Sequence, residues 1–209
     1  MTWAPSYAQT SDLASWLGTA DAPQLALPIE AASRAIDKET GRQFGFDEQI
    51  REYVPKWHRD RWYVSTDDMC SAPTLVQTIS EWDGSVLNTV TNLVLTPRNA
   101  AANGRVFTGF HYPMVPGGDG WYGYGYGPFW PRHQVIQVTA TFGWPEIPNT
   151  IQQATVMQAA RWWNRQDTAE GTPTRHRVDD VEYGFAPGQG LDPDVLAMVA
   201  PYLRWWGAA

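Results

Sequence analysis

Few side chains in this 209-residue sequence have the types and spacing that chemistry requires. The histidines are scattered and form no His-x-x-x-His or His-x-x-Glu pair, which a metal site would normally show. A single cysteine, Cys70, excludes an intramolecular disulfide, and we interpret it as a small, half-buried side chain. Neither a Gly-Lys-Ser/Thr phosphate loop nor a nucleophile elbow occurs. We therefore expect no catalytic residue, no metal ligand and no cofactor-binding residue.

Two pairs of adjacent acids are the remaining candidates for acid–base chemistry. They are Asp67-Asp68 and Asp179-Asp180. A general acid and a general base made from two carboxylates need burial that separates their pKa values. Polar neighbours surround both pairs in the sequence, so we predict solvated turns at both places. The protein is not expected to be an enzyme.

The charge balance argues against a protein that reads nucleic acid. The chain has 15 basic and 22 acidic residues, a formal net charge of −7, where a basic stripe would be typical of DNA or RNA binding. Two short basic clusters, 59–61 and 175–177, are interpreted as solvated loops. No run of about 18 apolar residues would span a membrane, and the first residues lack the basic and apolar regions of a secretory signal. We expect a protein kept in a cytosol or in a particle assembled there.

Four segments have the signatures of helices. Apolar residues recur at helical spacing within them, and prolines or capping residues mark where they begin. The stripe on the third is broad, which is typical of a central helix. Pro201 should kink or shorten the last one. The predicted helices are residues 11–18, 28–43, 148–165 and 192–205.

Between the second and third helices the sequence is rich in strand patterns. Residues 135–142 alternate apolar and polar side chains, as a strand with one buried face does. Residues 75–82 and 85–90 flank Asp83-Gly84, a dipeptide typical of a tight hairpin turn. The predicted sheet is therefore local and antiparallel. Shorter strand candidates lie at 54, 62–64, 93–95, 105–110 and 178–185.

These elements predict an α+β fold, with a small bundle of about four α-helices and an inserted antiparallel β subdomain. Residues 1–51 would supply the N-terminal helices, 52–143 the β subdomain, and 144–209 the C-terminal helices and tail. Two loops are long for a compact domain. They are the Gly/Tyr-rich stretch 113–131 and the polar connection 166–190.

Aromatic residues are unusually abundant, with 12 Trp and 9 Tyr. Such side chains are enriched at protein interfaces, although carbohydrate-binding proteins also favour Trp. The Gly/Tyr tract has two open interpretations, an adaptable binding surface or a flexible tip with no energetic role. Candidate partner-binding residues come from this tract and from the C-terminal tail. They are Trp121, Tyr122, Tyr124, Tyr126, Tyr202, Arg204, Trp205 and Trp206.

Four motifs, in the same order along the chain, resemble the head-to-tail adaptor (connector) proteins of long-tailed bacteriophages. Residues 28–44, PIEAASRAIDKETGRQF, resemble the first helix of that family. Residues 138–148, VTATFGWPEIP, are similar to its strand-to-helix junction, and 151–165 to its second long helix. Residues 191–204, which begin Leu-Asp-Pro-Asp-Val, resemble its closing segment. Together the motifs cover about a third of the chain, whereas the β insertion and the 166–190 loop are longer than the minimal family pattern.

The resemblance implies a non-enzymatic structural subunit of the virion neck, assembled in the cytoplasm of the bacterial host. Adaptors of this family form a homo-oligomeric ring, commonly of about twelve copies, whose interface must present two different patches on each copy. The ring lies beneath the portal protein and above the stopper or tail-completion protein. Genomic DNA passes through its lumen without sequence-specific binding. The family has no catalytic site to transfer to this chain.

Three other functions remain open at this stage. A stopper or tail terminator is the nearest alternative, although such proteins are usually richer in strands. A carbohydrate-binding module would account for the Trp and Tyr content. Against it, the pairs 162–163 and 205–206 lie on predicted helices, where core or subunit contacts explain them better. An enzyme would need a constellation of side chains that the sequence does not show.

Overall fold

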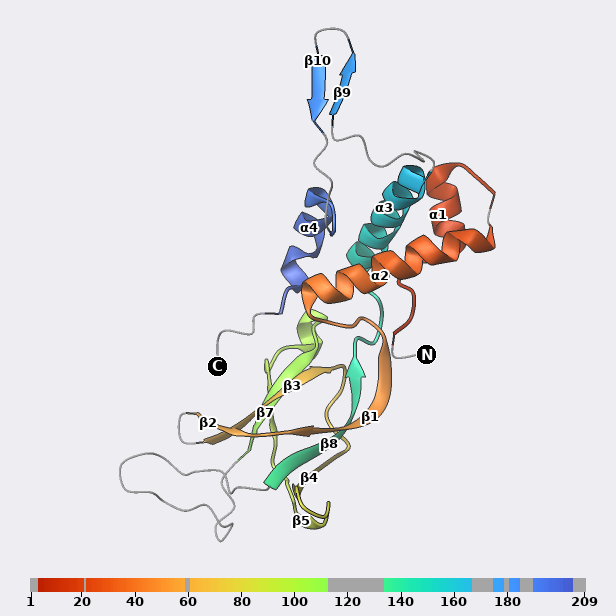
Figure 1. The fold of residues 1–209 in the computed structure, drawn as a ribbon. Coiled ribbons are helices and arrows are strands. Elements are labelled where there is room, and N and C mark those ends of the chain that lie inside the picture. The colour runs from red at the N-terminus through yellow and green to blue at the C-terminus, as the bar shows by residue number, and fades with distance from the viewer. Residues whose placement is uncertain are drawn as a thin grey trace. The chain divides into compact units, whose positions relative to one another are not determined.

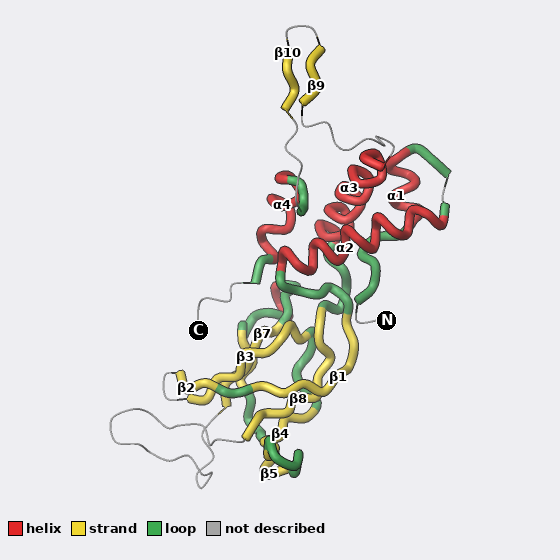
Figure 2. The backbone as a smooth tube through the Cα atoms, viewed as in Figure 1, coloured by secondary structure: helices red, strands yellow, loops and turns green. Residues whose placement is uncertain are grey.

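A computed structural model describes residues 4–20, 22–58, 61–112, 134–166, 175–178, 181–184 and 190–204. Contacts between residues divide the chain into two compact units. We call Gly45–Pro145 the β unit; Ala4–Phe44 and Glu146–Ala209 together form the helical unit. Figures 1 and 2 show the helices and strands that these units contain.

The helical unit is built around two long helices from opposite ends of the chain. Helix α2 (Ala26–Thr40) packs against α3 (Asn149–Gln166), and the shorter α1 (Thr10–Leu17) and α4 (Pro193–Val199) also contact α3. Short 3-10 turns, η1 (Pro23–Leu25) and η3 (Ala200–Tyr202), precede α2 and follow α4. None of the helices in the described ranges has the length and apolar character needed to cross a lipid bilayer.

Small side chains allow these helices to approach closely. Ala14 on α1, Ala32 on α2 and Ala159 on α3 are buried in one apolar cluster. Trp162 and Trp163 lie partly buried against the same cluster, which agrees with a packing role. The predicted α3 is observed, and its wide apolar stripe is explained by three helical neighbours. Larger members of the cluster are Leu13, Leu25, Ile29 and Val156.

Proline and glycine set the ends of these helices. Pro201 interrupts the last helix as predicted, so that α4 ends at Val199 and continues as η3. Gly41, in the left-handed conformation at φ 64°, ends α2 near the predicted position. Pro28 lies in the first turn of α2, but the helix begins at Ala26, because a proline within the first turn removes no intrahelical hydrogen bond.

The β unit is a curled, wholly antiparallel sheet. Its strand order is β5-β4-β8-β3-β7-β6, with β1 paired to β8 and β2 paired to β3. Strands β9 and β10 form a separate hairpin within the 166–190 connection. The strands are β1 (Phe46–Tyr53), β2 (Lys56–His58), β3 (Arg61–Met69), β4 (Leu75–Ser80), β5 (Val86–Thr89), β6 (Val94–Thr96), β7 (Phe107–Tyr112), β8 (Gln134–Gly143), β9 (Arg175–Val178) and β10 (Val181–Gly184).

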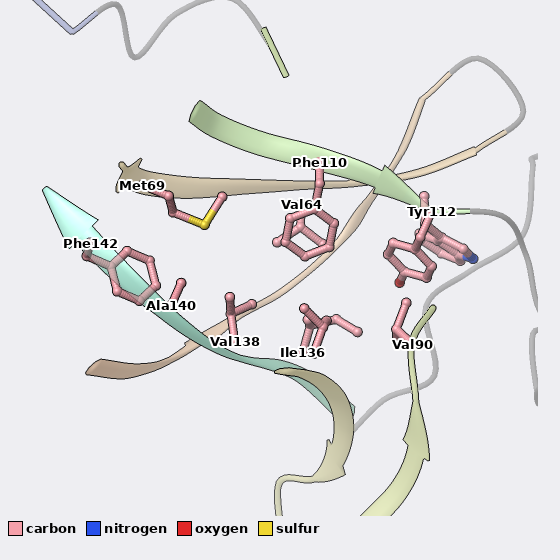
Figure 3. Close-up of a cluster of buried hydrophobic side chains, with 11 residues drawn as sticks. Val64, Met69, Val90, Phe110, Tyr112, Ile136, Val138, Ala140 and Phe142 are labelled. Atoms are coloured by element: carbon pink, nitrogen blue, oxygen red, sulfur yellow. The ribbon is translucent and has the colours of Figure 1, made fainter. Parts of the chain in front are cut away.

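The core of the β unit lies inside the curl. Ile136, Val138 and Phe142 point inward from β8 and are fully buried. They face Val64 of β3 and Phe110 of β7 across the interior, as Figure 3 shows. The alternation that predicted strand 135–142 is therefore the alternation between core and outer surface.

The predicted α+β class and antiparallel sheet are observed, but the first strand was missed. The sheet begins with β1 at Phe46 rather than near Glu52. Two inward positions of β1 are the polar residues Gln49 and Arg51, so the strand has no apolar alternation to detect. Arg51 is accommodated because its guanidinium lies 4.4 Å from the centroid of the Phe142 ring and binds a carboxylate.

Gly143 provides a test of the sheet closure. Its φ of 103° suits glycine, and a Cβ at this position would lie 1.8 Å from the Gly45 carbonyl oxygen. We expect Gly143→Ala to lower the free energy of unfolding of the β unit by about 2–4 kcal/mol, measured by chemical denaturation. Gly104→Ala is the matched control, because Gly104 has φ 61° and open space around its Cβ position. That change should cost only about 1 kcal/mol. Equal losses would contradict the role assigned to the Gly45 contact.

Candidate interaction surfaces

The two C-terminal candidates that the structure describes, Tyr202 and Arg204, lie against the end of α2. The Tyr202 ring meets the Phe44 ring edge-on, with centroids 5.6 Å apart. The Tyr202 carbonyl accepts a hydrogen bond of 2.6 Å from Arg42 Nε. The Arg204 amide donates to the Thr40 carbonyl at 2.9 Å. Residues 202–204 therefore pack against the end of α2. The partner-binding role predicted for the Tyr202 and Arg204 side chains remains a prediction.

The other six candidate residues lie outside the described residues, and so does the Gly/Tyr-rich stretch 113–131. Their predicted role in partner binding stays a prediction. They are Trp121, Tyr122, Tyr124, Tyr126, Trp205 and Trp206.

The N-terminal segment is anchored to α2 by Tyr7, which is 1% exposed. Its hydroxyl donates a short hydrogen bond to Asp37 and accepts one of 3.0 Å from the Phe44 amide. Its own amide donates to Ser33 Oγ at 3.0 Å. Arg34 Nε lies 3.3 Å from Asp37 and compensates the carboxylate charge. Burial raises the pKa of both Tyr7 and Asp37.

A charged cluster joins α3 to the start of α4. Arg161 forms a two-pronged ion pair with Asp194 and lies 3.3 Å from Asp192. Asp192 also binds Arg165 at 2.8 Å, and its amide donates to Gln158 Oε1 at 2.9 Å. Because these residues stand on either side of the 166–190 connection, the cluster holds the two ends of that connection together. In the sequence, this cluster could have been recognised from Arg161 and Arg165, which are spaced one helical turn apart on α3.

The acid pair Asp67-Asp68 is not a solvated turn, and that prediction was wrong. Both residues lie in strand β3, where successive side chains point to opposite faces. Asp67 binds Arg51 at 2.5 Å and accepts from the Tyr53 hydroxyl at 3.1 Å. Asp68 is 4% exposed and accepts a 3.0 Å hydrogen bond from Trp144 Nε1. Each carboxylate is thus engaged separately. The second pair, Asp179-Asp180, lies outside the described residues.

Two further chemical candidates were a cysteine and a metal site. Cys70 is half-buried, as predicted, and its thiol contacts the Thr141 carbonyl at 3.4 Å. Burial raises its pKa, which disfavours the reactive thiolate. Across the described ranges, no group of three His, Cys, Asp or Glu side chains is arranged to hold a metal ion.

Exposed apolar side chains are concentrated on the outer surface of the β unit. Ile50 of β1 and Leu75 of β4 pair with the same β8 residue, Thr139, from opposite sides. They therefore lie in one row across the face that is turned away from the core. An antiparallel sheet with one solvated face normally carries polar residues there. Among the residues that the structure describes, the large exposed apolar ones of this unit are Ile50, Val54, Leu75, Trp82, Val86 and Leu87; Trp16 and Leu27 are those of the helical unit.

The β4–β5 hairpin carries the most exposed of these residues. Trp82, next to the predicted Asp-Gly turn, is 78% exposed. The Asp83 carboxylate accepts from the amide and hydroxyl of Ser85, at 3.1 and 2.8 Å, which fixes the turn. These hydrogen bonds hold the pKa of Asp83 below its usual range. The sequence predicted the turn but did not single out Trp82, because exposure depends on what the rest of the fold covers.

A scan against protein-family models gave no match, and a search of curated proteins gave none either. A search of solved structures gave a match over 100% of this chain and 96% of the other, with a TM-score of 0.56 and 15% identity. That chain comes from the neck of an empty gene transfer agent (GTA) particle computed with C6 symmetry. The two chains share a fold. The match extends over the sequence of both units.

The anchoring role of the Tyr7 hydroxyl can be tested by removing that group alone. Tyr7→Phe removes the hydrogen bond to the Asp37 carboxylate, which keeps its ion pair with Arg34, and leaves the buried Phe44 amide without its acceptor, so we expect a loss of about 1–3 kcal/mol in the free energy of unfolding. Urea unfolding monitored by far-UV circular dichroism measures the change. Tyr63→Phe, in strand β3 of the β unit, is the control for loss of a phenol hydroxyl. An equal effect of both substitutions would contradict the anchoring role of Tyr7.

The cluster between α3 and α4 predicts a pH dependence. The Arg161 guanidinium holds the pKa of Asp194 at about 2, below its ordinary value of 3.8. Because the folded pKa is depressed, the stabilisation is present above about pH 4 and is lost as the pH falls through about 2. The difference in melting temperature between wild type and Asp194→Asn should therefore shrink from pH 6 to pH 2. Glu30→Gln, at an exposed position of α2, is the control. The same pH trend in both variants would contradict the assignment of this pH dependence to the Arg161–Asp194 ion pair.

Proposed function

We propose that this protein is a structural subunit of a phage-type neck, the adaptor ring that joins the head to the tail. The observation that carries this proposal is the full-length fold match with a chain of a GTA neck. The four adaptor-like motifs add to it, because in the sequence they fall on the helices before and after the inserted sheet and on the end of its strand β8. They correspond to α2, the end of β8, α3 and the segment around α4.

A ring of identical copies fits the surface of the chain. Each copy of a closed ring needs two different patches that meet in the next copy. Exposed apolar residues on the β unit supply candidate contact area. The neighbour's particle was computed with C6 symmetry, which accords with repeated copies around an axis. About twelve copies are proposed here, from the adaptor resemblance.

The proposed partners follow from this position. The ring would contact the portal protein on one side and a stopper or tail-completion protein on the other, within a virion assembled in the bacterial cytoplasm. DNA would pass through its lumen. With a formal charge of −7 per copy, the ring would not attract phosphate by counterion release, which suits passage rather than binding.

We propose a structural rather than a catalytic role. The acids that had the best spacing for chemistry, Asp67 and Asp68, are engaged by Arg51 and Trp144. A stopper or tail terminator is the second candidate, since it also belongs to a neck. The two long helices α2 and α3 that flank the sheet favour the adaptor.

Native mass spectrometry and electron microscopy of the purified protein, alone and mixed with portal-containing heads, test this function. We expect rings, or recruitment of multiple copies to the portal vertex. Heads without portal are the control and should recruit none. A chain that stays monomeric and never joins portal-containing particles would contradict the proposal. Specific binding to soluble glycans would favour a carbohydrate-binding module instead.

A further inference from the structure

The β4–β5 hairpin forms a protruding apolar and acidic surface, which we call the tip surface. It consists of Glu81, Trp82, Val86 and Leu87, all exposed. Trp82, Val86 and Leu87 are 78%, 55% and 50% exposed, respectively. Trp is the residue type that most often dominates the binding energy of a protein interface.

The strand behind this surface lacks the usual protection of a sheet edge. Strand β5 is the last strand on its side of the sheet order. Edge strands are normally guarded by charged residues or proline, because exposed apolar edges promote association. Residues 85–96, which include β5 and β6, the strands at the two ends of this order, contain neither a charged residue nor a proline. This edge is therefore suited to being covered by another protein surface.

A basic surface of the same unit lies in the turn between β6 and β7, which we call the basic turn. Arg98 and Arg105 are exposed on either side of the 3-10 turn η2 (Ala101–Asn103). Pro97, Ala101 and Ala102 beside them are also exposed, and their small side chains leave room for a large ring to approach. Arginine beside small apolar groups can stack on an indole ring by a cation–π interaction.

The two surfaces lie at opposite ends of the sheet, as the strand registers show. Ser80, which precedes the hairpin turn, pairs with Gln134 at the start of β8. Phe107, which follows the basic turn, pairs with Met69, and Met69 pairs with Phe142 near the end of β8. Gln134 and Phe142 are separated by about 26 Å along an extended strand. Within one copy the two surfaces therefore cannot meet.

We propose that the tip surface of one copy packs against the basic turn of the next copy. The occupant is a second copy of this chain because the two surfaces have opposite charge. Glu81 lies beside Trp82 on one surface, and Arg98 and Arg105 lie beside small residues on the other. Burial of the Trp82 ring supplies most of the affinity, and the charges orient the contact. A contact between two different surfaces is head-to-tail, and rotation at each step closes it into a ring. The inference rests on the proposed ring function and assigns its subunit contact.

Removal of the Trp82 side chain tests the contact. We expect Trp82→Ser to weaken self-association by at least about 10-fold in sedimentation and native mass measurements over a concentration series. Leu27→Ser is the matched control, since Leu27 is 71% exposed on α2 but belongs to neither surface. It should assemble like the wild type. Circular dichroism of both variants checks that the fold is retained. A folded Trp82→Ser protein that assembles like the wild type overturns the proposal.

Charge reversal separates this contact from other interfaces. Glu81→Lys and Arg98→Glu should each weaken association, whereas the double variant restores the opposite charges and should recover most of it. A double variant that associates no better than the single variants overturns the assignment of the two surfaces. If the variants leave assembly unchanged but rings still join portal-containing heads, the proposed function stands and this contact is wrong. If the wild type neither self-associates nor joins heads, both are wrong.

Discussion

The pairing of β1 with β8 is the constraint on which the rest of the structure depends. Strand β8 is paired with β1 and β4, and at Phe142 with β3, so it is an interior strand of the sheet. Its register decides which of its side chains enter the core, and a slip of one residue would turn Ile136 and Val138 toward solvent. The close approach of Gly143 to Gly45 fixes that register at one end.

The pairing of β1 with β8 also brings together the first and last residues of the β unit. Phe46 lies opposite Gly143, and the Trp144 amide approaches the Gly45 carbonyl at 3.4 Å. The Trp144 side chain is held by Asp68, a buried acid in strand β3. Because the two connections leave the sheet side by side, α2 and α3 can follow from them and still pack on each other.

The elements that could be predicted from the sequence are those with one face buried along their whole length. Helix α3 and strand β8 have regular apolar periods because each has one consistently buried face. Strand β1 was missed because its inward side carries Arg51, which is tolerated only through Phe142 and Asp67, residues distant in the sequence. Asp68 was misassigned for the same reason. Of the candidate site, the aromatic excess was visible, but the exposure of Trp82 depends on tertiary packing that a local pattern does not encode.

The side-by-side junctions of the β unit also have a consequence for changes in its length. Loop-closure entropy grows with the length of the chain between two fixed points, and here the sheet itself fixes those points by forming its own hydrogen bonds. The entropy lost in bringing α2 and α3 together is therefore little greater with an insertion of about a hundred residues than with a short connection. Changes in the length of the insertion should therefore leave the packing between α2 and α3 intact.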